Sequence, residues 1–117
     1  NVDVIRRTRE LGLASLPGAM TPTEIMTAHR AGASFVKLFH IADLGSKYVK
    51  AVRAPISHVK LLAVGGVNEN NLKEFFAAGC VGAGIGGNLV NKAWIDAGEY
   101  NKITETARML VEIAKES

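Results

Sequence analysis

Short apolar runs alternate with amphipathic segments along this chain of 117 residues. The apolar runs lie near 13–16, 35–39, 60–64 and 81–85, and their length and their β-branched and aromatic content are typical of buried strands. The segments between and around them carry apolar side chains at helical spacing. Strands that alternate with helices predict an α/β fold with a parallel sheet and right-handed crossovers, built as a single unit over 1–117.

Capping signals place the ends of several predicted helices. The segment 21–24, Thr-Pro-Thr-Glu, combines a capping box with proline at the first helical position, so a helix is expected from there to about Ala31. Asp43 and Asn68 are predicted to cap the next two helices. The first and last helices are predicted from two apolar stripes, one of Val4, Ile5, Thr8 and Leu11 and one of Ile103, Ala107, Leu110, Val111 and Ala114.

Four strand-and-helix units permit two closures of the sheet. One is a small open doubly wound sheet, and the other is half of an eight-stranded (β/α)8 barrel, which normally needs ~200 or more residues. A dinucleotide-binding sheet would carry a G-x-G-x-x-G turn after its first strand, where this chain has Pro17-Gly18. Glycine pairs instead follow the third and fourth strands, as expected after strands seven and eight of a barrel. This placement favours the second half of a barrel.

Lys37 lies inside the apolar run 35–39 and is the first candidate for chemistry. Strand alternation places it on the same face as Phe35 and Phe39. One interpretation is that the lysine extends its ammonium group to water. The other is that desolvation lowers its pKa from ~10.4 toward ~7–8, so that the free amine attacks a carbonyl and forms a Schiff base.

The glycine pairs are candidates for binding an anion. Gly65-Gly66 and Gly86-Gly87, the latter followed by Asn88, each come directly after a predicted strand. Turns without side chains let backbone N–H groups approach a phosphate closely. Two such turns at one sheet edge are expected to form two walls of one phosphate site, although a glycine pair taken alone is more often a simple turn.

Composition narrows the classes of function. The net charge of +3 comes from scattered side chains without a basic run, so anionic small molecules are a more natural partner than nucleic acid. One cysteine, Cys80, excludes an internal disulfide framework and suits a reducing compartment. The sequence shows no signal peptide and no apolar run of membrane length. We therefore expect a cytoplasmic location and no membrane partner. The three histidines are dispersed along the chain, so no metal site is expected.

The combination of motifs resembles the second half of the bacterial 2-keto-3-deoxy-6-phosphogluconate (KDPG) and 4-hydroxy-2-oxoglutarate (KHG) aldolases. The resemblance implies a (β/α)8 barrel of which this chain supplies about four units, usually a trimer, with no metal or organic cofactor. It implies an aldehyde-lyase that reversibly cleaves a 2-keto-4-hydroxy acid to pyruvate and an aldehyde, either glyceraldehyde 3-phosphate or glyoxylate. The segments that carry it are Leu16-Pro17-Gly18, Thr21-Pro22-Thr23-Glu24, Val36-Lys37-Leu38-Phe39, Gly65-Gly66-Val67 and Gly86-Gly87.

The resemblance also implies roles for individual residues. Lys37 matches the Schiff-base lysine, and Phe39 matches the aromatic residue beside the pyruvyl group. Pro17 and Val64 are further expected substrate contacts. The backbone that holds the substrate phosphate is matched by Gly65, Gly66, Gly86 and Gly87, with Asn88 beside it.

Three residues depart from the family pattern. His40 stands where proline usually follows the Lys-x-Phe motif, and it is expected to be structural more often than catalytic. Val64 stands where members that prefer KDPG commonly have threonine, so phosphogalactonate-type and hydroxyoxoglutarate substrates stay open. Asn88 replaces the usual serine and still offers a hydrogen-bonding side chain.

The resemblance places further catalytic groups outside these 117 residues. The proton-shuttling glutamate and the arginine and threonine that bind the pyruvate carboxylate belong to the first four strands of the family's barrel. Four strands alone expose two edges and an apolar face, so the chain is expected to self-associate, to pair with the other half, or to be a piece of a longer aldolase that is weakly active or inactive alone. The alternatives are a non-catalytic half-barrel that binds phosphorylated metabolites or self-assembles, and another phosphate-binding barrel enzyme.

Overall fold

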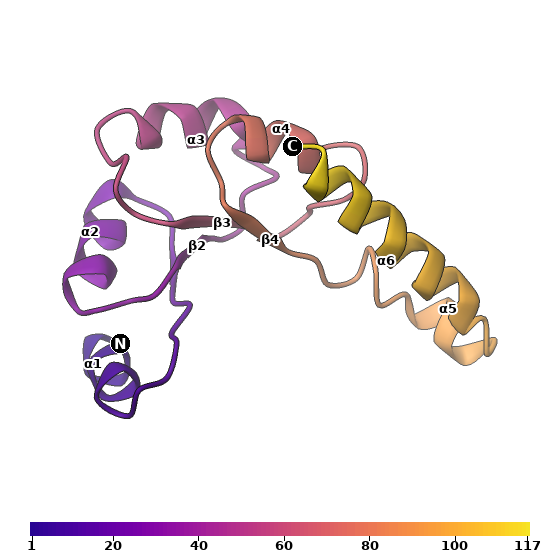
Figure 1. Cartoon of the computed structure of the whole chain (residues 1–117), viewed down its shortest axis with the longest axis horizontal. Helices are drawn as coiled ribbons and strands as arrows, with labels where there is room; N and C mark the ends of the chain where they lie inside the picture. The colour runs from indigo at the N-terminus through magenta and orange to yellow at the C-terminus, as the bar shows by residue number, and fades with distance from the viewer.

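Six helices and four strands follow one another in the computed structural model, which describes residues 1–117 (Figure 1). None of the helices is long and apolar enough to cross a membrane. The strands are β1 (Gly18–Ala19), β2 (Val36–Leu38), β3 (Leu61–Val64) and β4 (Gly82–Gly84). The helices are α1 (Val2–Glu10), α2 (Pro22–Arg30), α3 (Gly45–Arg53), α4 (Leu72–Ala77), α5 (Lys92–Asp96) and α6 (Tyr100–Lys115).

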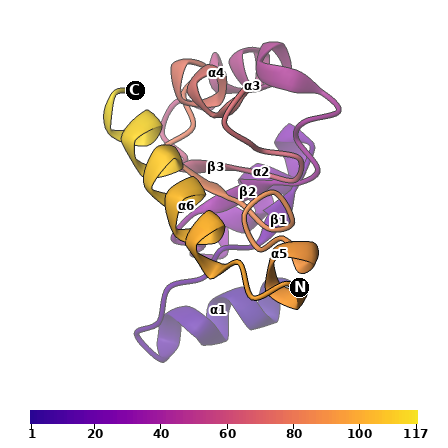
Figure 2. The same cartoon turned by 90° about the vertical axis from the view of Figure 1, so that its right-hand side faces the viewer.

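The strands pair in parallel in their chain order, β1-β2-β3-β4, which confirms the predicted parallel α/β sheet. Their register places Gly18, Lys37, Leu62 and Gly82 in one row across the sheet. In Figure 1 the helices α2, α3 and α4 lie to one side of the strands, and Figure 2 shows α6 alongside α4. We call the face toward these helices the outer face and the opposite face, which carries the row of Lys37, the inner face.

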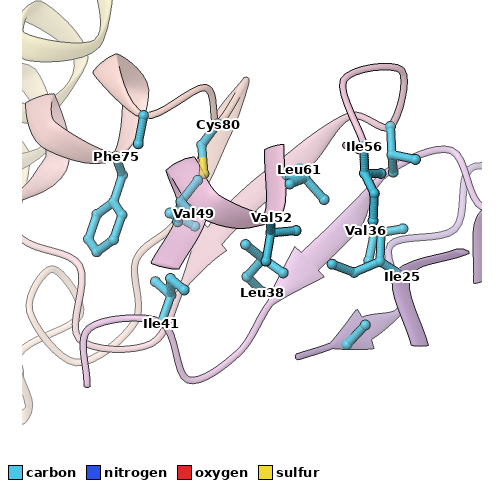
Figure 3. Close-up of a cluster of buried hydrophobic side chains, with 14 of the residues drawn as sticks. Ile25, Val36, Leu38, Ile41, Val49, Val52, Ile56, Leu61, Phe75 and Cys80 are labelled. Atoms are coloured by element: carbon cyan, nitrogen blue, oxygen red, sulfur yellow. The ribbon is translucent and has the colours of Figure 1, made fainter. Parts of the chain in front are cut away.

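The hydrophobic core lies between the outer face and the helices (Figure 3). Strand alternation explains the composition of that face, because every second side chain of β2 and β3 points to it. These side chains are fully buried: Val36, Leu38, Leu61 and Ala63. Their partners from the helices and loops include Ile25, Ile41, Val49, Val52, Ile56 and Phe75.

The molecule is more open than a closed domain of the same length. Its radius of gyration is 15.4 Å, whereas a compact domain of this size is expected at roughly 13 Å. The edges formed by β1 and β4 have no neighbouring strand. Large apolar side chains are exposed before both edge strands, with Leu13 at 63%, Leu16 at 49% and Val81 at 51%. The expected open edges of a half-barrel are therefore present.

The predicted position of the first strand is wrong. The expected strand near 13–16 is not a regular strand, and β1 consists of Gly18–Ala19, although the carbonyls of Ser15 and Pro17 already accept hydrogen bonds from the N–H groups of Phe35 and Lys37. The sequence analysis treated Pro17-Gly18 as a turn. Gly18 instead lies beside Lys37, where a Cβ would come within 3.3 Å of the lysine Cε, so the glycine makes room for a neighbouring side chain.

The helix caps divide into confirmed and incorrect predictions. The capping box between Thr21 and Glu24 is present. Asp43 does not cap α3, whose first residues follow Leu44 without a side-chain cap. The N-cap of α4 is Asn71, and Asn68 instead accepts a hydrogen bond from the N–H of Asn70 in the preceding turn.

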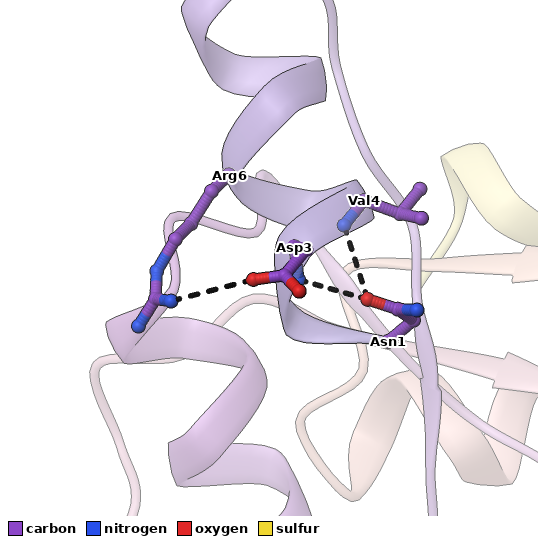
Figure 4. Close-up of polar contacts among 4 residues, drawn as sticks. All are labelled: Asn1, Asp3, Val4 and Arg6. Atoms are coloured by element: carbon purple, nitrogen blue, oxygen red, sulfur yellow. Dashed lines mark hydrogen bonds and ion pairs between the residues drawn. The ribbon is translucent and has the colours of Figure 1, made fainter.

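The apolar stripe predicted for α1 is only partly correct. Ile5 is buried, but Val4 and Leu11 are exposed, because only one side of α1 faces α2. The sequence analysis also missed the N-cap. Asn1 accepts hydrogen bonds from the N–H groups of Asp3 and Val4, and Asp3 forms an exposed ion pair with Arg6 at 3.7 Å (Figure 4). Such an exposed pair contributes little to stability, so the cap and Ile5 are the main anchors of this helix.

The two faces of β3 provide a matched test of this fold. Leu61→Ala removes a fully buried side chain from the outer face and is expected to lower the free energy of unfolding by about 2–5 kcal/mol. Leu62→Ala shortens the half-buried neighbouring side chain on the inner face. It is expected to lower the free energy of unfolding by less than about half as much as Leu61→Ala. Urea denaturation followed by circular dichroism measures both. Equal losses would show that the inner face is covered in solution.

The single cysteine gives a pH-dependent prediction. Burial raises the pKa of Cys80 to about 11 from an ordinary 9.0, against the opposite effect of the nearby Arg53 guanidinium. Below pH 9 the thiol is protonated in both the folded and the unfolded chain. Between pH 9 and 11 only the unfolded chain loses this proton, so the free energy of unfolding should fall.

Comparison with Cys80→Ala isolates this effect from the titration of lysines and tyrosines. The stability of the native chain relative to the variant is expected to decrease as the pH rises from 8 to 11, as measured by urea denaturation at each pH. Parallel stability curves for the two proteins would contradict a raised pKa at Cys80.

Candidate active site

The candidate residues meet at the edge of the sheet where the strands end. Because all four strands are parallel, their carboxyl ends lie on one edge, which is where ligands bind in open and closed α/β sheets. The loops at this edge are Phe39–Leu44 after β2, Gly65–Asn71 after β3 and Ile85–Asn91 after β4.

Lys37 presents its amine on the inner face of the sheet. Its side chain is half-buried, and it forms neither a hydrogen bond nor an ion pair with another side chain. The Nζ atom lies 5.6 Å from the centre of the Phe39 ring, which confirms that these two residues share a face. The Phe35 ring, which was expected on the same face, has the Nζ of Lys60 over it at 5.5 Å. Lys37 is therefore a half-buried lysine whose amine has no acidic partner within the chain.

The Gly65-Gly66 loop adopts a conformation that requires glycine. Both residues have positive φ, at 95° and 72°, where other residues are strained. A Cβ on Gly65 would lie 2.6 Å from the His40 ring, and one on Gly66 would lie 2.5 Å from the Ala42 Cβ. The N–H of Ala42 also donates to the carbonyl of Gly65 at 3.1 Å. The loops after β2 and β3 are thus packed together with almost no space between them.

The Gly86-Gly87 loop has a different structural basis. Neither residue has positive φ, and a Cβ on either would meet no atom within 4 Å. The carbonyl of Gly86 accepts hydrogen bonds from the N–H groups of Leu89 and Val90, which closes a single turn. Asn88 donates through Nδ2 to the carbonyl of Val67 at 2.9 Å and so joins this loop to the one after β3. Packing within the chain does not explain the two glycines.

Both loops present backbone N–H groups that have no acceptor within the protein. Such groups bind phosphate oxygens when several of them converge in a turn without side chains. Their presence in the loops after two adjacent strands makes this edge chemically suited to an anion. The free groups belong to Gly65, Gly66, Val67, Gly86, Gly87 and Asn88.

Val64 and Pro17 occupy different positions relative to this edge. Val64 ends β3 on the inner face, and its Cγ2 lies 3.1 Å from where a Cβ on Gly84 would be. It is thus on the face that carries Lys37. Pro17 precedes β1, and its carbonyl accepts the N–H of Lys37 at 2.9 Å. Pro17 therefore holds the lysine backbone, and its ring lines a groove with α1 and α2 rather than the loops at the carboxyl edge.

His40 and Asp43 form a pair that the sequence analysis did not anticipate. The Nδ1 of His40 lies 3.2 Å from the Asp43 carboxylate without forming a regular hydrogen bond to it. The His40 ring also lies edge-on to Phe39, with centroids 5.6 Å apart. The available signal was the histidine itself, which stands at a position where the family resemblance leads one to expect proline.

A comparison of two glycines tests the structure of these loops. Gly65→Ala is expected to lower the free energy of unfolding by about 1–3 kcal/mol, because it combines a positive φ with a clash against His40. In Gly86→Ala the new methyl group points into open space, so the free energy of unfolding is expected to change by less than about 0.5 kcal/mol. Thermal and urea denaturation provide the measurement. A costly Gly86→Ala would show that the second loop is packed against something in solution.

Known proteins similar to this chain share both its sequence and its fold. The family model described as "KDPG and KHG aldolase" matches residues 1–106. The 2-dehydro-3-deoxy-6-phosphogalactonate aldolase of Escherichia coli strain K12 is 43% identical over 88 residues, which are 74% of this chain and 43% of that enzyme. The KHG/KDPG aldolase of the same strain is 32% identical over 114 residues, which are 96% of this chain and 53% of that enzyme.

A solved structure agrees with these similarities. The structure titled "Native KDPGal structure" superposes with a TM-score of 0.90 at 35% identity, over 99% of this chain and 55% of that one. The chain therefore spans about half the length of the relatives that it matches, and its four-stranded sheet corresponds to part of a (β/α) barrel.

Proposed function

Since this chain belongs to the KDPG and KHG aldolase family, we propose that it supplies the Schiff-base lysine and the phosphate-binding loops of a class I aldolase. The observation that carries the proposal is the placement of Lys37. Its unpaired amine lies on the inner face beside Phe39, one strand away from a loop with unpaired N–H groups. This arrangement offers a nucleophile for a ketone and a cradle for a phosphate on one sheet edge.

The proposed reaction begins when the neutral amine of Lys37 adds to the C2 ketone of the substrate. Uptake of one proton from solvent and loss of water then give a protonated imine. The imine accepts the electron pair of the C3–C4 bond as the C4 hydroxyl loses its proton. This step releases the aldehyde and leaves an enamine. Protonation of C3 and hydrolysis of the imine then return pyruvate and the free lysine.

The other residues of this chain bind and orient the substrate in this proposal. Phe39 packs against the pyruvyl carbons and restricts the access of water to the imine. The unpaired amides of the two glycine loops hold the phosphate, which fixes the far end of the substrate. Asn88 keeps the two loops together through its bond to Val67. The groups that transfer protons and bind the carboxylate would come from the first four strands of the complete barrel.

The substrate class follows from the relatives and from Val64. Over the matched residues, this chain is 43% identical to the relative named as a phosphogalactonate aldolase and 32% identical to the one named as a KHG/KDPG aldolase. Val64 also lacks the hydroxyl that threonine would direct to the sugar. We therefore place the galactonate epimer of the phosphorylated 2-keto-3-deoxy acid first, with glyceraldehyde 3-phosphate as the aldehyde product.

The working enzyme is proposed to be a complete barrel assembled as a homotrimer in the cytoplasm, where Cys80 stays reduced. The isolated chain is expected to show little or no turnover. Its inner face lacks the groups from the other strands, and a Schiff base alone does not complete the proton transfers.

Chemical trapping tests the role of Lys37 without requiring turnover. The chain is incubated with pyruvate and reduced with borohydride, and the modified peptide is identified by mass spectrometry. A carboxyethyl group is expected on Lys37 and should be lost in Lys37→Arg. Lys60→Arg is the matched control, because Lys60 also lies over a phenylalanine ring but on the segment leading into β3.

The same assay is repeated on this chain joined to the first four strands of a relative. Failure of Lys37 to react there would refute the aldolase assignment. A non-catalytic phosphate-binding half-barrel would then be the better description. Equal labelling of Lys37 and Lys60 would show random modification of surface amines rather than a tuned nucleophile.

A further inference from the structure

His40 occupies a position from which its ring reaches the anion-binding loop after β3. The ring lies along the Gly65-Gly66 backbone, with Cδ2 and Cγ nearest to Gly65 and with Cε1 and Nε2 nearest to Gly66. A Cβ on Gly66 would lie 3.6 Å from Nε2, so this nitrogen is close to the Gly66 backbone. The N–H of Gly66 is one of the groups without an acceptor.

The two ring nitrogens have different surroundings. Nδ1 is buried and lies 3.2 Å from the Asp43 carboxylate. Nε2 has no hydrogen-bond partner in the protein and is not among the buried unpaired atoms, so it faces solvent. The Asp43 carboxylate therefore occupies the Nδ1 side of the ring and leaves Nε2 as the nitrogen that an anion can reach. His40 thus has one nitrogen directed at an anchor and one nitrogen available to a ligand.

We propose that His40 is a phosphate-binding residue that makes this site select phosphorylated 2-keto-4-hydroxy acids over unphosphorylated ones. Its Nε2–H donates to a phosphate oxygen held by the free amides of Gly65, Gly66 and the loop after β4. Asp43 is a positioning residue that orients the ring from the Nδ1 side. The inference rests on the proposed function for the identity of the substrate, and it goes beyond it by assigning a side chain to the phosphate.

The contacts around the loops support this assignment. Bonds from N–H donors to a phosphate oxygen are charge-assisted, so each further donor beside the free amides strengthens anion binding. Lys37 is committed to the ketone end of the substrate in the proposed reaction. The centre of the Phe39 ring lies 5.6 Å from the Nζ of Lys37 and 5.6 Å from the His40 ring centre. His40 in turn lies against Gly65 and Gly66, whose amides are proposed to hold the phosphate.

A structural role alone would not leave Nε2 free. The ring fills the space over the two glycines, and a hydrocarbon side chain of similar volume would do the same. The imidazole instead keeps 42% of its side chain exposed while its other nitrogen lies 3.2 Å from the Asp43 carboxylate. A polar group that is oriented on one side and open on the other is the arrangement expected of a ligand-binding histidine.

Nuclear magnetic resonance on the ¹⁵N-labelled chain tests the proposal with inorganic phosphate and glycerol 3-phosphate as probes. Either probe is expected to shift the amide signals of Gly65, Gly66, Gly86 and Gly87 and the Nε2 signal of His40 with one common Kd at pH 6. Glycerol should shift none of them. The ring nitrogens of His29 and His58 serve as internal controls and should not follow the same curve.

Two substitutions separate the contact from general packing. His40→Gln is expected to weaken phosphate binding about tenfold, since the flexible amide does not hold an N–H donor at the position of Nε2 as the packed ring does, whereas His29→Gln should leave the Kd unchanged. Asp43→Ala is expected to weaken binding less and to change the ¹⁵N shifts of the His40 ring, while the signals of His29 and His58 stay in place. His40→Asn serves if the glutamine variant does not fold.

The outcomes distinguish this inference from the proposed function. If phosphate shifts the glycine amide signals with the same Kd in the wild type and in His40→Gln, the proposed role of His40 is overturned. No glycine shift at any accessible phosphate concentration would overturn it as well. Borohydride trapping of pyruvate on Lys37 is measured on the same samples and decides the aldolase assignment independently, since neither result depends on phosphate.

Discussion

The burial of the outer face of β2 and β3 determines where the candidate nucleophile of this chain lies. Val36 and Leu38 are fully buried against the helices, so the residue between them must point to the opposite face. That residue is Lys37. Moving the register by one position would bury the ammonium group and expose two core side chains, at a cost that no available contact offsets. The position of the amine is thus a consequence of core packing.

Glycine provides space for different purposes at successive positions around this lysine. Gly18 leaves room for the Lys37 side chain in the neighbouring strand, while Gly65 and Gly66 allow His40 to lie directly on their backbone. Gly86 and Gly87 face open space. A side chain there would clash with nothing in the chain, and access for a bound anion gives the two glycines a purpose. The three cases look alike in the sequence and differ only in what each glycine contacts.

The openness of the sheet links the fold to the proposed activity. The inner face, the two free edges and the exposed apolar residues Leu13, Leu16 and Val81 are all surfaces that a complete barrel would cover. The chain matches 55% of a solved relative, so the candidate nucleophile Lys37 and the proposed phosphate loops fall in one half of that architecture. In the proposed function, the chemistry of carbon–carbon cleavage is divided between the halves, with the nucleophile and the anion anchor in this one.

Local sequence patterns determined the parallel α/β sheet, the strands that became β2, β3 and β4, the capping box at Thr21 and the candidate role of Lys37. These features depend on period and on residue type, which a linear pattern contains. The tertiary structure decided the rest. It moved the first strand to Gly18–Ala19, because pairing with β2 matters more there than the turn preference of Pro17-Gly18. It also directed Asp43 to His40 instead of a helix end, and His40 onto Gly66, because these contacts join loops that only the sheet brings together.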